Sequence, residues 1–534
     1  MTMEQMTRKA FAPDCDVPLA SASSAVSPSS ATASSVNPWW GIGDFGVFGL
    51  WIAIVGFTLS YHEKWMDEAQ AWLFARDLDL YTLWFHELRY EGSPGLWHTI
   101  LWVAQHVFHA RYGAIGPIGM ICAAAGVALL IFKAPFPRIV RWPLAFTYFM
   151  VYQYAVIARQ YVLLPLFAFA AAILFKDRMH PGRMTLVLVL LANVSFHGTL
   201  LAGCLGLAYL MEAMRSWRTL ERPVRNRYLI CTGVMVITFV FLFIVLKPAP
   251  DSIPIIARGR LLHPPAWRNQ HGQDITLSVR VATMVSGAFF DYLAPSVIFL
   301  VLAAVWCFLR GRLLVFLLPV GLEIALYAFL YGTVHHHGTA FVAAITGLWI
   351  AWPSDHEQRT LPIHESRALQ GMIVLLLCLC AVNIWDAAVV IKREYLYPYC
   401  GAEDAANYLK AVGADHGSIF GYDFGISAVQ AYFDRNILAN ISTSYTHNGL
   451  TSQAFTFDAD ELERVKPEYV VVYTKDPKGT MQENGPRLAS LGYELVHFSD
   501  GYYFYKRVVP NRESYLILRR IRPGAGQAPA QAQN

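Results

Sequence analysis

The sequence has few charged residues for its length. Only 15% of its 534 residues are Asp, Glu, Lys or Arg, whereas 55% are hydrophobic; soluble domains carry about a quarter charged residues. This scarcity excludes a soluble, collagen-like or disordered protein and indicates a polytopic membrane protein. The net charge of +4 is modest, and the basic residues gather in short loops between apolar runs, a pattern that reports orientation in a membrane and not a nucleic-acid partner.

The sequence also lacks a cysteine framework and a signal peptide. Most of its eight cysteines lie inside apolar segments, so neither a disulfide scaffold nor a zinc site is indicated. Residues 1–40 are rich in Ser and Ala and lack the basic, apolar and cleavage regions of a signal peptide, so we predict a disordered cytoplasmic tail. Residues 523–534, rich in Pro, Gly, Ala and Gln, predict a second disordered tail.

Long apolar runs dominate the first 392 residues. Each is long enough, or nearly so, to cross a bilayer. The runs are 45–61, 113–132, 142–158, 160–175, 184–211, 228–246, 292–309, 313–334, 338–352 and 368–391. They predict an all-α polytopic membrane domain over residues 41–392.

Three basic loops between these runs give the orientation. The loops 133–141, 176–183 and 214–227 are rich in Lys and Arg and are therefore predicted to be cytoplasmic. All three loops can be cytoplasmic only if 62–112 is one large external loop, with 94–109 along the membrane surface. In addition, 184–211 must make two short crossings that bend near Phe196, His197 and Gly198. The prediction is about 11 transmembrane helices, with the amino terminus in the cytoplasm.

Residues 398–508 lack the long apolar runs of the membrane domain. Short helical patterns alternate with strand-like runs, of which Tyr469 to Tyr473 is the most apolar. Tyr493–Phe498 and Tyr502–Lys506 are predicted to pair around Asp500-Gly501. We therefore predict a small extracytoplasmic α/β domain after the last crossing.

An acidic pair follows the first apolar run. Asp67 and Glu68 stand in the stretch His62 to Trp72, just outside the predicted membrane helix. A carboxylate at the mouth of the membrane domain can act as a general base. The alternative is a solvated helix start, since Asp and Glu favour the first turn of a helix.

The order of motifs resembles the first external loop of GT-C superfamily glycosyltransferases. The motifs are Asp67-Glu68-Ala69-Gln70-Ala71-Trp72, followed by Arg89 to His98 with Pro94-Gly95-Leu96-Trp97. The pattern is similar to the bacterial branch related to protein O-mannosyltransferases and to lipid A aminoarabinose or galacturonic acid transferases (glycosyltransferase 39/83-like). In that branch an acidic motif follows the first membrane helix and a Pro-containing surface helix precedes the second.

Two later motifs extend the resemblance. Ala158-Arg159-Gln160-Tyr161 is similar to the branch's Ser-Arg-Asn-Tyr motif, with Ala and Gln replacing Ser and Asn. His335-His336-His337-Gly338 resembles its Arg-His-His-Gly segment, with His in place of Arg. The resemblance covers roughly residues 45–350 and implies a GT-C-like fold in a bacterial inner membrane.

The activity that the resemblance implies is transfer of a sugar from a polyprenyl-phosphate donor to an extracytoplasmic lipid, glycan or protein acceptor. Inverting transfer needs a base, for which Asp67 is the candidate, and Glu68 would orient it. The departing lipid phosphate needs cations around it. Metal dependence stays open: a divalent cation, Mg²⁺ or Mn²⁺, would suit the two carboxylates, but neighbouring side chains on a helix diverge.

Candidates for binding the donor come from three regions. Arg159 lies between two apolar runs, where it is either an interface anchor or a phosphate ligand. The histidines 335–337 cannot all face one metal from a regular helix, so they either bind phosphate or sugar or satisfy the interface. The external loop 247–291 is basic, and it either is solvated, binds lipid headgroups or covers the donor phosphate. The predicted substrate-binding residues are Arg159, Tyr161, His336, His337, Lys247 and Arg258.

Two other functions remain open at this stage. A polyprenyl-linked glycan polymerase or ligase would use the same carrier with longer glycans. A transporter or flippase would belong to another class, although the ionisable residues concentrate in external loops and the motifs do not repeat in a second half. The predicted partners are the polyprenyl-phosphate donor, the acceptor and the bilayer.

Overall fold

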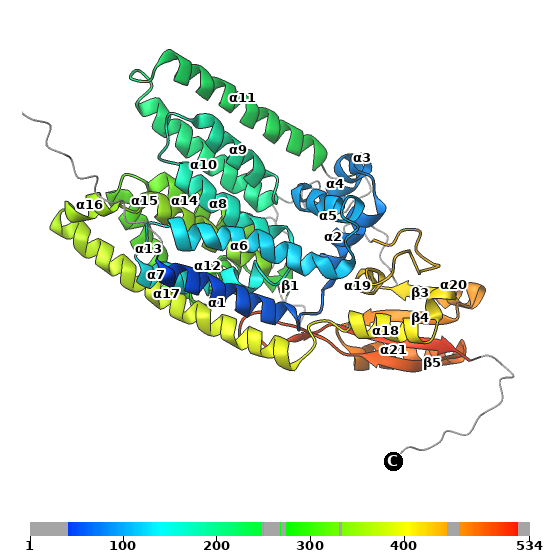
Figure 1. Cartoon of the computed structure of the whole chain (residues 1–534). Helices are drawn as coiled ribbons and strands as arrows, with labels where there is room; N and C mark the ends of the chain where they lie inside the picture. Colours follow the sequence, from blue (N-terminus) through cyan, green and yellow to red (C-terminus); the bar gives the residue numbers. More distant parts are fainter. Residues whose placement is uncertain are drawn as a thin grey trace, which may run out of the picture. The chain divides into compact units, whose positions relative to one another are not determined.

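A computed structural model describes residues 41–247, 249, 267–268, 274–329, 334–445 and 459–521. The predicted tails at 1–40 and 523–534 lie outside these residues, as does Arg258. The described part is mostly helical, with a small sheet towards its carboxyl end (Figure 1).

The membrane domain is built from helices whose apolar composition matches the predicted runs. The helices before residue 250 are α1 (Ile42–Leu59), α2 (Met66–Asp77), α3 (Leu80–Thr82), α4 (Leu88–Glu91), α5 (Leu96–His106), α6 (Ile115–Lys133), α7 (Arg138–Ala145), α8 (Leu164–Leu174), α9 (Pro181–Ala192), α10 (Phe196–Arg215) and α11 (Arg222–Val245). After a short β1–β2 pair (Trp267–Arg268, Asp274–Ile275) follow α12 (Leu277–Ala288), α13 (Leu293–Leu309), α14 (Leu313–Phe329), α15 (His337–Ala351), α16 (Asp355–Arg359) and α17 (Ile363–Leu396).

The chain is an integral membrane protein, but the predicted count of eleven crossings is not confirmed. Within the described residues, five helices are long and apolar enough to cross a bilayer, or six if α12 and α13, bent by 74°, form one span. Shorter apolar helices cover Gln160–Leu174, Pro181–Ala192 and Leu313–Phe329. The run 142–158 differs most from a regular crossing: after α7, with Pro143 inside it, the chain makes a π-helical turn at Phe149–Gln153.

Two local predictions are confirmed. The run 184–211 divides into α9 and α10, and the break lies just before Phe196, where the Ser195 side chain accepts a hydrogen bond from the Gly198 amide and caps α10. The Pro94-Gly95 start predicts a helix, and α5 begins at Leu96.

The carboxyl-terminal domain is a four-stranded mixed sheet with helices. Its elements are α18 (Ala402–Ala411), β3 (Ile419–Tyr422), α19 (Ile426–Gln430), α20 (Ala459–Val465), β4 (Tyr469–Thr474), α21 (Pro477–Ser490), β5 (Tyr493–Ser499), β6 (Tyr502–Tyr503), β7 (Asn511–Arg512) and β8 (Ser514–Arg520). The strand order is β3-β4-β8-β5, with β3 and β4 parallel and β8 antiparallel to both of its neighbours.

The structure corrects the predicted pairing in this domain. β5 pairs with β8 and not with Tyr502–Lys506, so the sheet extends beyond the predicted boundary at 508. β8 is the apolar strand Ser514–Arg520, beyond that boundary, and it lies inside the sheet between β4 and β5. Of the predicted strand Tyr502–Lys506, only Tyr502–Tyr503 forms a strand, β6, which pairs with β7. The residues that follow contact the membrane domain instead.

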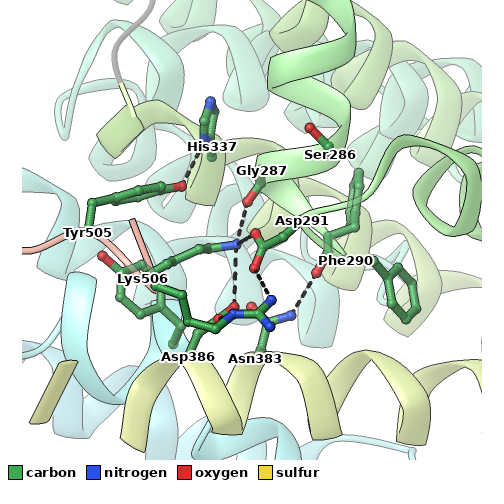
Figure 2. Close-up of polar contacts among 12 residues, drawn as sticks. Ser286, Gly287, Phe290, Asp291, His337, Asn383, Asp386, Tyr505 and Lys506 are labelled. Atoms are coloured by element: carbon green, nitrogen blue, oxygen red, sulfur yellow. Dashed lines mark hydrogen bonds and ion pairs between the residues drawn. The ribbon is translucent and has the colours of Figure 1, made fainter. Parts of the chain in front are cut away.

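We call residues 503–507 the tongue. The Lys506 ammonium donates to the Gly287 carbonyl at 2.7 Å and contacts the Asp291 carboxylate at 2.6 Å, while the Tyr505 hydroxyl lies 2.6 Å from His337 Nδ1 (Figure 2). Lys506 is only 2% exposed. Since a buried ammonium needs anionic and carbonyl partners, these contacts hold the carboxyl-terminal domain in one register on the membrane domain.

Candidate active site

The site forms at the start of α2, where backbone capping fixes the acidic pair. The Glu68 carboxylate accepts a hydrogen bond from the Trp65 amide at 2.9 Å, which ends the preceding loop and begins the helix. This capping turns Glu68 inward, where it is fully buried, whereas Asp67 keeps about a fifth of its side chain exposed. The two neighbouring carboxylates therefore face different surroundings.

Glu68 belongs to a buried network with His62. His62 Nε2 lies 3.0 Å from Glu68, and His62 Nδ1 lies 3.0 Å from Glu394 at the end of α17. The other Glu68 oxygen accepts from the Ala158 amide at 2.8 Å. The network connects four segments: the loop after α1, the start of α2, the residue before Arg159 and the end of α17.

The charges in this network explain its pKa shifts. Burial alone lowers the pKa of His62, but the carboxylates of Glu394 and Glu68 outweigh burial and raise this pKa to about 10. Burial alone raises the pKa of Glu68, but His62 and the amides of Trp65 and Ala158 outweigh burial and lower it. At neutral pH the network therefore holds an imidazolium beside an ionised Glu68.

The second carboxylate, Asp67, pairs with the predicted phosphate ligand. Arg159 Nη1 lies 2.9 Å from Asp67 Oδ2. The Arg159 guanidinium also lies 6.0 Å from the ring centroid of Trp65 and 5.6 Å from that of Tyr161. Two aromatic rings and one carboxylate thus orient a cation that is 16% exposed and can still be reached from outside.

The carboxyl-terminal domain contributes to the same site. Glu513, just before β8, accepts hydrogen bonds from Trp65 Nε1 at 3.2 Å and from the Tyr473 hydroxyl at 2.6 Å. The Tyr503 ring of the tongue lies 5.2 Å from the Trp65 ring. Burial raises the pKa of Glu513, with Lys475 acting in the opposite direction. Contacts from two separate parts of this domain therefore fix the indole that packs on Arg159.

A layer of imidazole and phenol rings lies next to Arg159, inside the membrane domain. The Tyr161 and His336 rings are 5.8 Å apart, and His336 stacks on His197 at 4.5 Å. His197 Nδ1 lies 2.5 Å from Glu323, which also accepts from the Thr339 hydroxyl. Glu323 is therefore a paired buried carboxylate.

The structure brings some of the predicted site residues together and separates others. Asp67, Arg159, Tyr161 and His336 form a continuous set of contacts. His337 instead contacts Tyr505 in the tongue (Figure 2) and the Tyr327 ring. Lys247 is exposed just beyond α11, and Arg258 lies outside the described residues.

The acidic pair does not suit a divalent cation. Asp67 is paired with Arg159, and both Glu68 oxygens already accept hydrogen bonds within the buried network. In the part of the chain that the structure describes, no group of three or more His, Cys, Asp or Glu residues is arranged to hold a metal ion. No step of the chemistry below is therefore assigned to a metal.

Several residues of the site were not predicted. They are His62, Trp65, Glu394, Tyr503 and Glu513. His62 and Trp65 stand in the acidic stretch itself, so their position beside Asp67 was a signal that could have been used. Glu394, Tyr503 and Glu513 come from distant segments, and nothing in the local sequence brings them to α2.

Comparisons with known proteins give matches among solved structures alone. No family model and no curated protein matches the sequence. The solved structures that match include the crystal structure of ArnT from Cupriavidus metallidurans bound to undecaprenyl phosphate, with 13% sequence identity, a TM-score of 0.49, and coverage of 92% of this chain and 100% of that chain.

Proposed function

We propose that this protein transfers a sugar from a polyprenyl-phosphate donor to an extracytoplasmic acceptor, with inversion at the anomeric carbon. The observation that carries the proposal is the Asp67–Arg159 pair, held between Trp65 and Tyr161 beyond the carboxyl end of α1. It combines the two groups that the reaction needs: a carboxylate that can take a proton and a cation that can hold a departing phosphate.

The roles follow from the chemistry of the transfer. Asp67 accepts the proton of the acceptor hydroxyl while that oxygen attacks the anomeric carbon. The bond between this carbon and the phosphate oxygen breaks, and its electron pair stays on the lipid phosphate. Arg159 then carries the new negative charge, since a guanidinium can hold a phosphate through two parallel hydrogen bonds.

Donor binding also changes the partner of Arg159. In the substrate-free protein the guanidinium contacts Asp67 at 2.9 Å. A donor phosphate competes for the same guanidinium, and when Arg159 turns to it, the Asp67 carboxylate is released to accept the proton. Substrate binding thus prepares the base, and without a donor the base stays paired.

The remaining site residues have supporting roles. Glu68 positions Asp67 from within the buried network, because both of its oxygens are occupied there. Tyr161 and His336 line the inner side of Arg159 and are proposed to contact the donor. His337 and Lys247 remain predicted donor ligands, as does Arg258, which lies outside the described residues.

The test is transfer by purified protein in proteoliposomes given radiolabelled polyprenyl-phosphate sugars. We expect release of polyprenyl phosphate together with a labelled acceptor, one sugar per turnover. Repeated addition to one chain would indicate a polymerase instead. Movement of intact donor between leaflets without release of polyprenyl phosphate would indicate a flippase and overturn the proposal.

A further inference from the structure

An apolar groove runs along the membrane domain between α1 and α17. The two helices run alongside each other (Figure 1), but α1 packs mainly on α6 and α17 mainly on α7. The space left between them is a groove of about 750 Å³, lined by Leu50 and Ile54 of α1, Arg138 and Trp142 of α7, and Ala388 and Ile391 of α17.

A second hollow continues this groove towards the end of α17. It has a volume of about 580 Å³ and shares Ile54, Ala388 and Ile391 with the first. It ends at Lys392 and at Tyr395, whose ring stacks with Phe57 at 6.1 Å between centroids. From Ile384, which lines the first hollow, to Tyr395 the groove extends roughly 16 Å at the helical rise of 1.5 Å per residue.

The opposite end of the groove carries an excess of positive charge. The fully buried Asp44 carboxylate contacts Arg138 and Arg141, each at 3.0 Å, and accepts from Trp142 Nε1 at 2.8 Å. One carboxylate cannot neutralise two guanidinium groups. The Arg138 side chain is 52% exposed and lines the groove, so it presents both its charge and further donors to whatever occupies the groove.

We propose that this groove binds an anionic phospholipid of the bilayer, with the phosphate at Arg138 and one acyl chain along α1 and α17. The length of the groove matches that of one acyl chain, because one chain spans half of a hydrocarbon core that is about 30 Å thick. The charge agrees as well, since basic pockets at helix ends on the cytoplasmic side select anionic headgroups. Arg138 belongs to the loop 133–141, which the positive-inside rule assigns to that side.

The proposed lipid is distinct from the sugar donor. The donor phosphate must reach Arg159 beside Asp67, beyond the carboxyl end of α1, whereas Arg138 lies beside Asp44 near its amino end. From Asp44 to its last residue, Leu59, α1 rises roughly 22 Å, and the two positions are at least that far apart along the helix. One phosphate cannot contact both arginines, so a headgroup at Arg138 belongs to a second lipid.

Two variants test the proposal through different parts of the groove. Arg138→Ala removes the cation at its mouth, and Ala388→Trp fills it at an exposed, lipid-facing position that lines both hollows. The matched controls are Arg227→Ala, an exposed arginine of α11, and Val301→Trp, an exposed position of α13 outside the groove. Wild type and variants are purified in mild detergent, and retained lipids are counted by mass spectrometry.

We expect wild type and both controls to retain phosphatidylglycerol, and both groove variants to lose it. Added phosphatidylglycerol should raise the Tm of wild type more than phosphatidylethanolamine does, and the Arg138→Ala variant should need a roughly tenfold higher concentration. If Arg138→Ala fails to fold, Ala388→Trp alone decides. Equal retention by the groove variants would overturn the proposal. So would retention of polyprenyl phosphate that Ala388→Trp removes and Arg138→Ala does not, because the groove would then hold the donor chain.

Discussion

Arg159 and Asp67 form an ion pair of 2.9 Å between a residue that precedes α8 and the first turn of α2. The pair is partly exposed, with 16% of the Arg159 side chain and 21% of the Asp67 side chain accessible. A substrate phosphate can therefore reach the guanidinium without unfolding the buried network beneath it. Each partner holds the other in place until a phosphate replaces Asp67 as the partner of Arg159. Substitutions of Asp67 and of Arg159 separate their roles.

Asp67→Asn should lower the transfer rate by about 10²- to 10⁴-fold, the usual effect of losing a positioned general base. Asn has nearly the same shape but cannot accept the proton. The measurement is the initial rate of purified protein at matched expression, and Asp77→Asn, on the same helix and paired with Arg76, is the control. If Asp67 only starts a helix, Asn caps equally well, and a rate within about twofold of wild type would refute the assignment.

Arg159→Ala should lower the transfer rate by about 10²-fold or more, because it removes the charge that meets the departing phosphate. Arg159→Lys should restore only part of the activity, since an ammonium is a point charge and cannot form the two parallel hydrogen bonds. Rates at several donor concentrations measure both effects. Arg183→Ala, an exposed arginine at the start of α9, serves as the control. Full activity of Arg159→Ala would remove this residue from the site.

Glu513→Ala should raise the KM for the donor severalfold with a smaller change in kcat. The substitution removes the acceptor of the Trp65 Nε1 hydrogen bond, and the indole then packs less firmly on Arg159. Glu513→Gln keeps an acceptor oxygen and should retain most of the affinity. Glu494→Ala, exposed on β5, controls for changes in the domain itself. An unchanged KM in Glu513→Ala would show that the domain does not position Arg159.

The stability of the protein should fall as pH rises through the pKa of His62, about 10. This pKa lies above the unfolded value near 6.5, so the imidazolium contributes its full stability below about pH 6.5 and loses it as the pH rises through about 10. The Tm of wild type and of His62→Gln, followed across this range, measures the contribution as the difference between the two. A difference that does not change with pH would contradict an imidazolium at this position. His106→Gln, at an exposed histidine of α5, should leave the pH dependence as in wild type.

The topology predicts opposite accessibility for two exposed positions. Arg218→Cys lies in the basic loop predicted to be cytoplasmic, and Lys478→Cys lies on α21 of the carboxyl-terminal domain. An impermeant thiol reagent applied to intact cells should label position 478 and spare position 218, and permeabilised cells should show both. The opposite pattern would show that the positive-inside assignment is wrong. Wild type gives the background from its own cysteines.

Local sequence predicted the parts of the site that share a segment. Asp67 and Glu68 were found because an acidic pair beside a long apolar run stands out in composition. The different roles of the two carboxylates could not be predicted from the sequence. The hydrogen bond from the Trp65 amide turns Glu68 inward and leaves Asp67 partly exposed, and the spacing of the two residues does not show this. The central place of β8 in the sheet was missed because its partner β5 was assigned to the nearer residues 502–506.

The sequence by itself determined that this chain enters a membrane, where its long helices begin, and which segment holds the acidic pair, since burial of apolar surface and helical periodicity are local properties of composition. Only the tertiary structure decided that Asp67 pairs with Arg159, that Glu394 meets His62, and that Glu513 reaches Trp65. The partners in these three contacts are 92, 332 and 448 positions apart in the sequence, and they meet because packing brings their segments together. A single sequence carries no local signal for such long-range contacts.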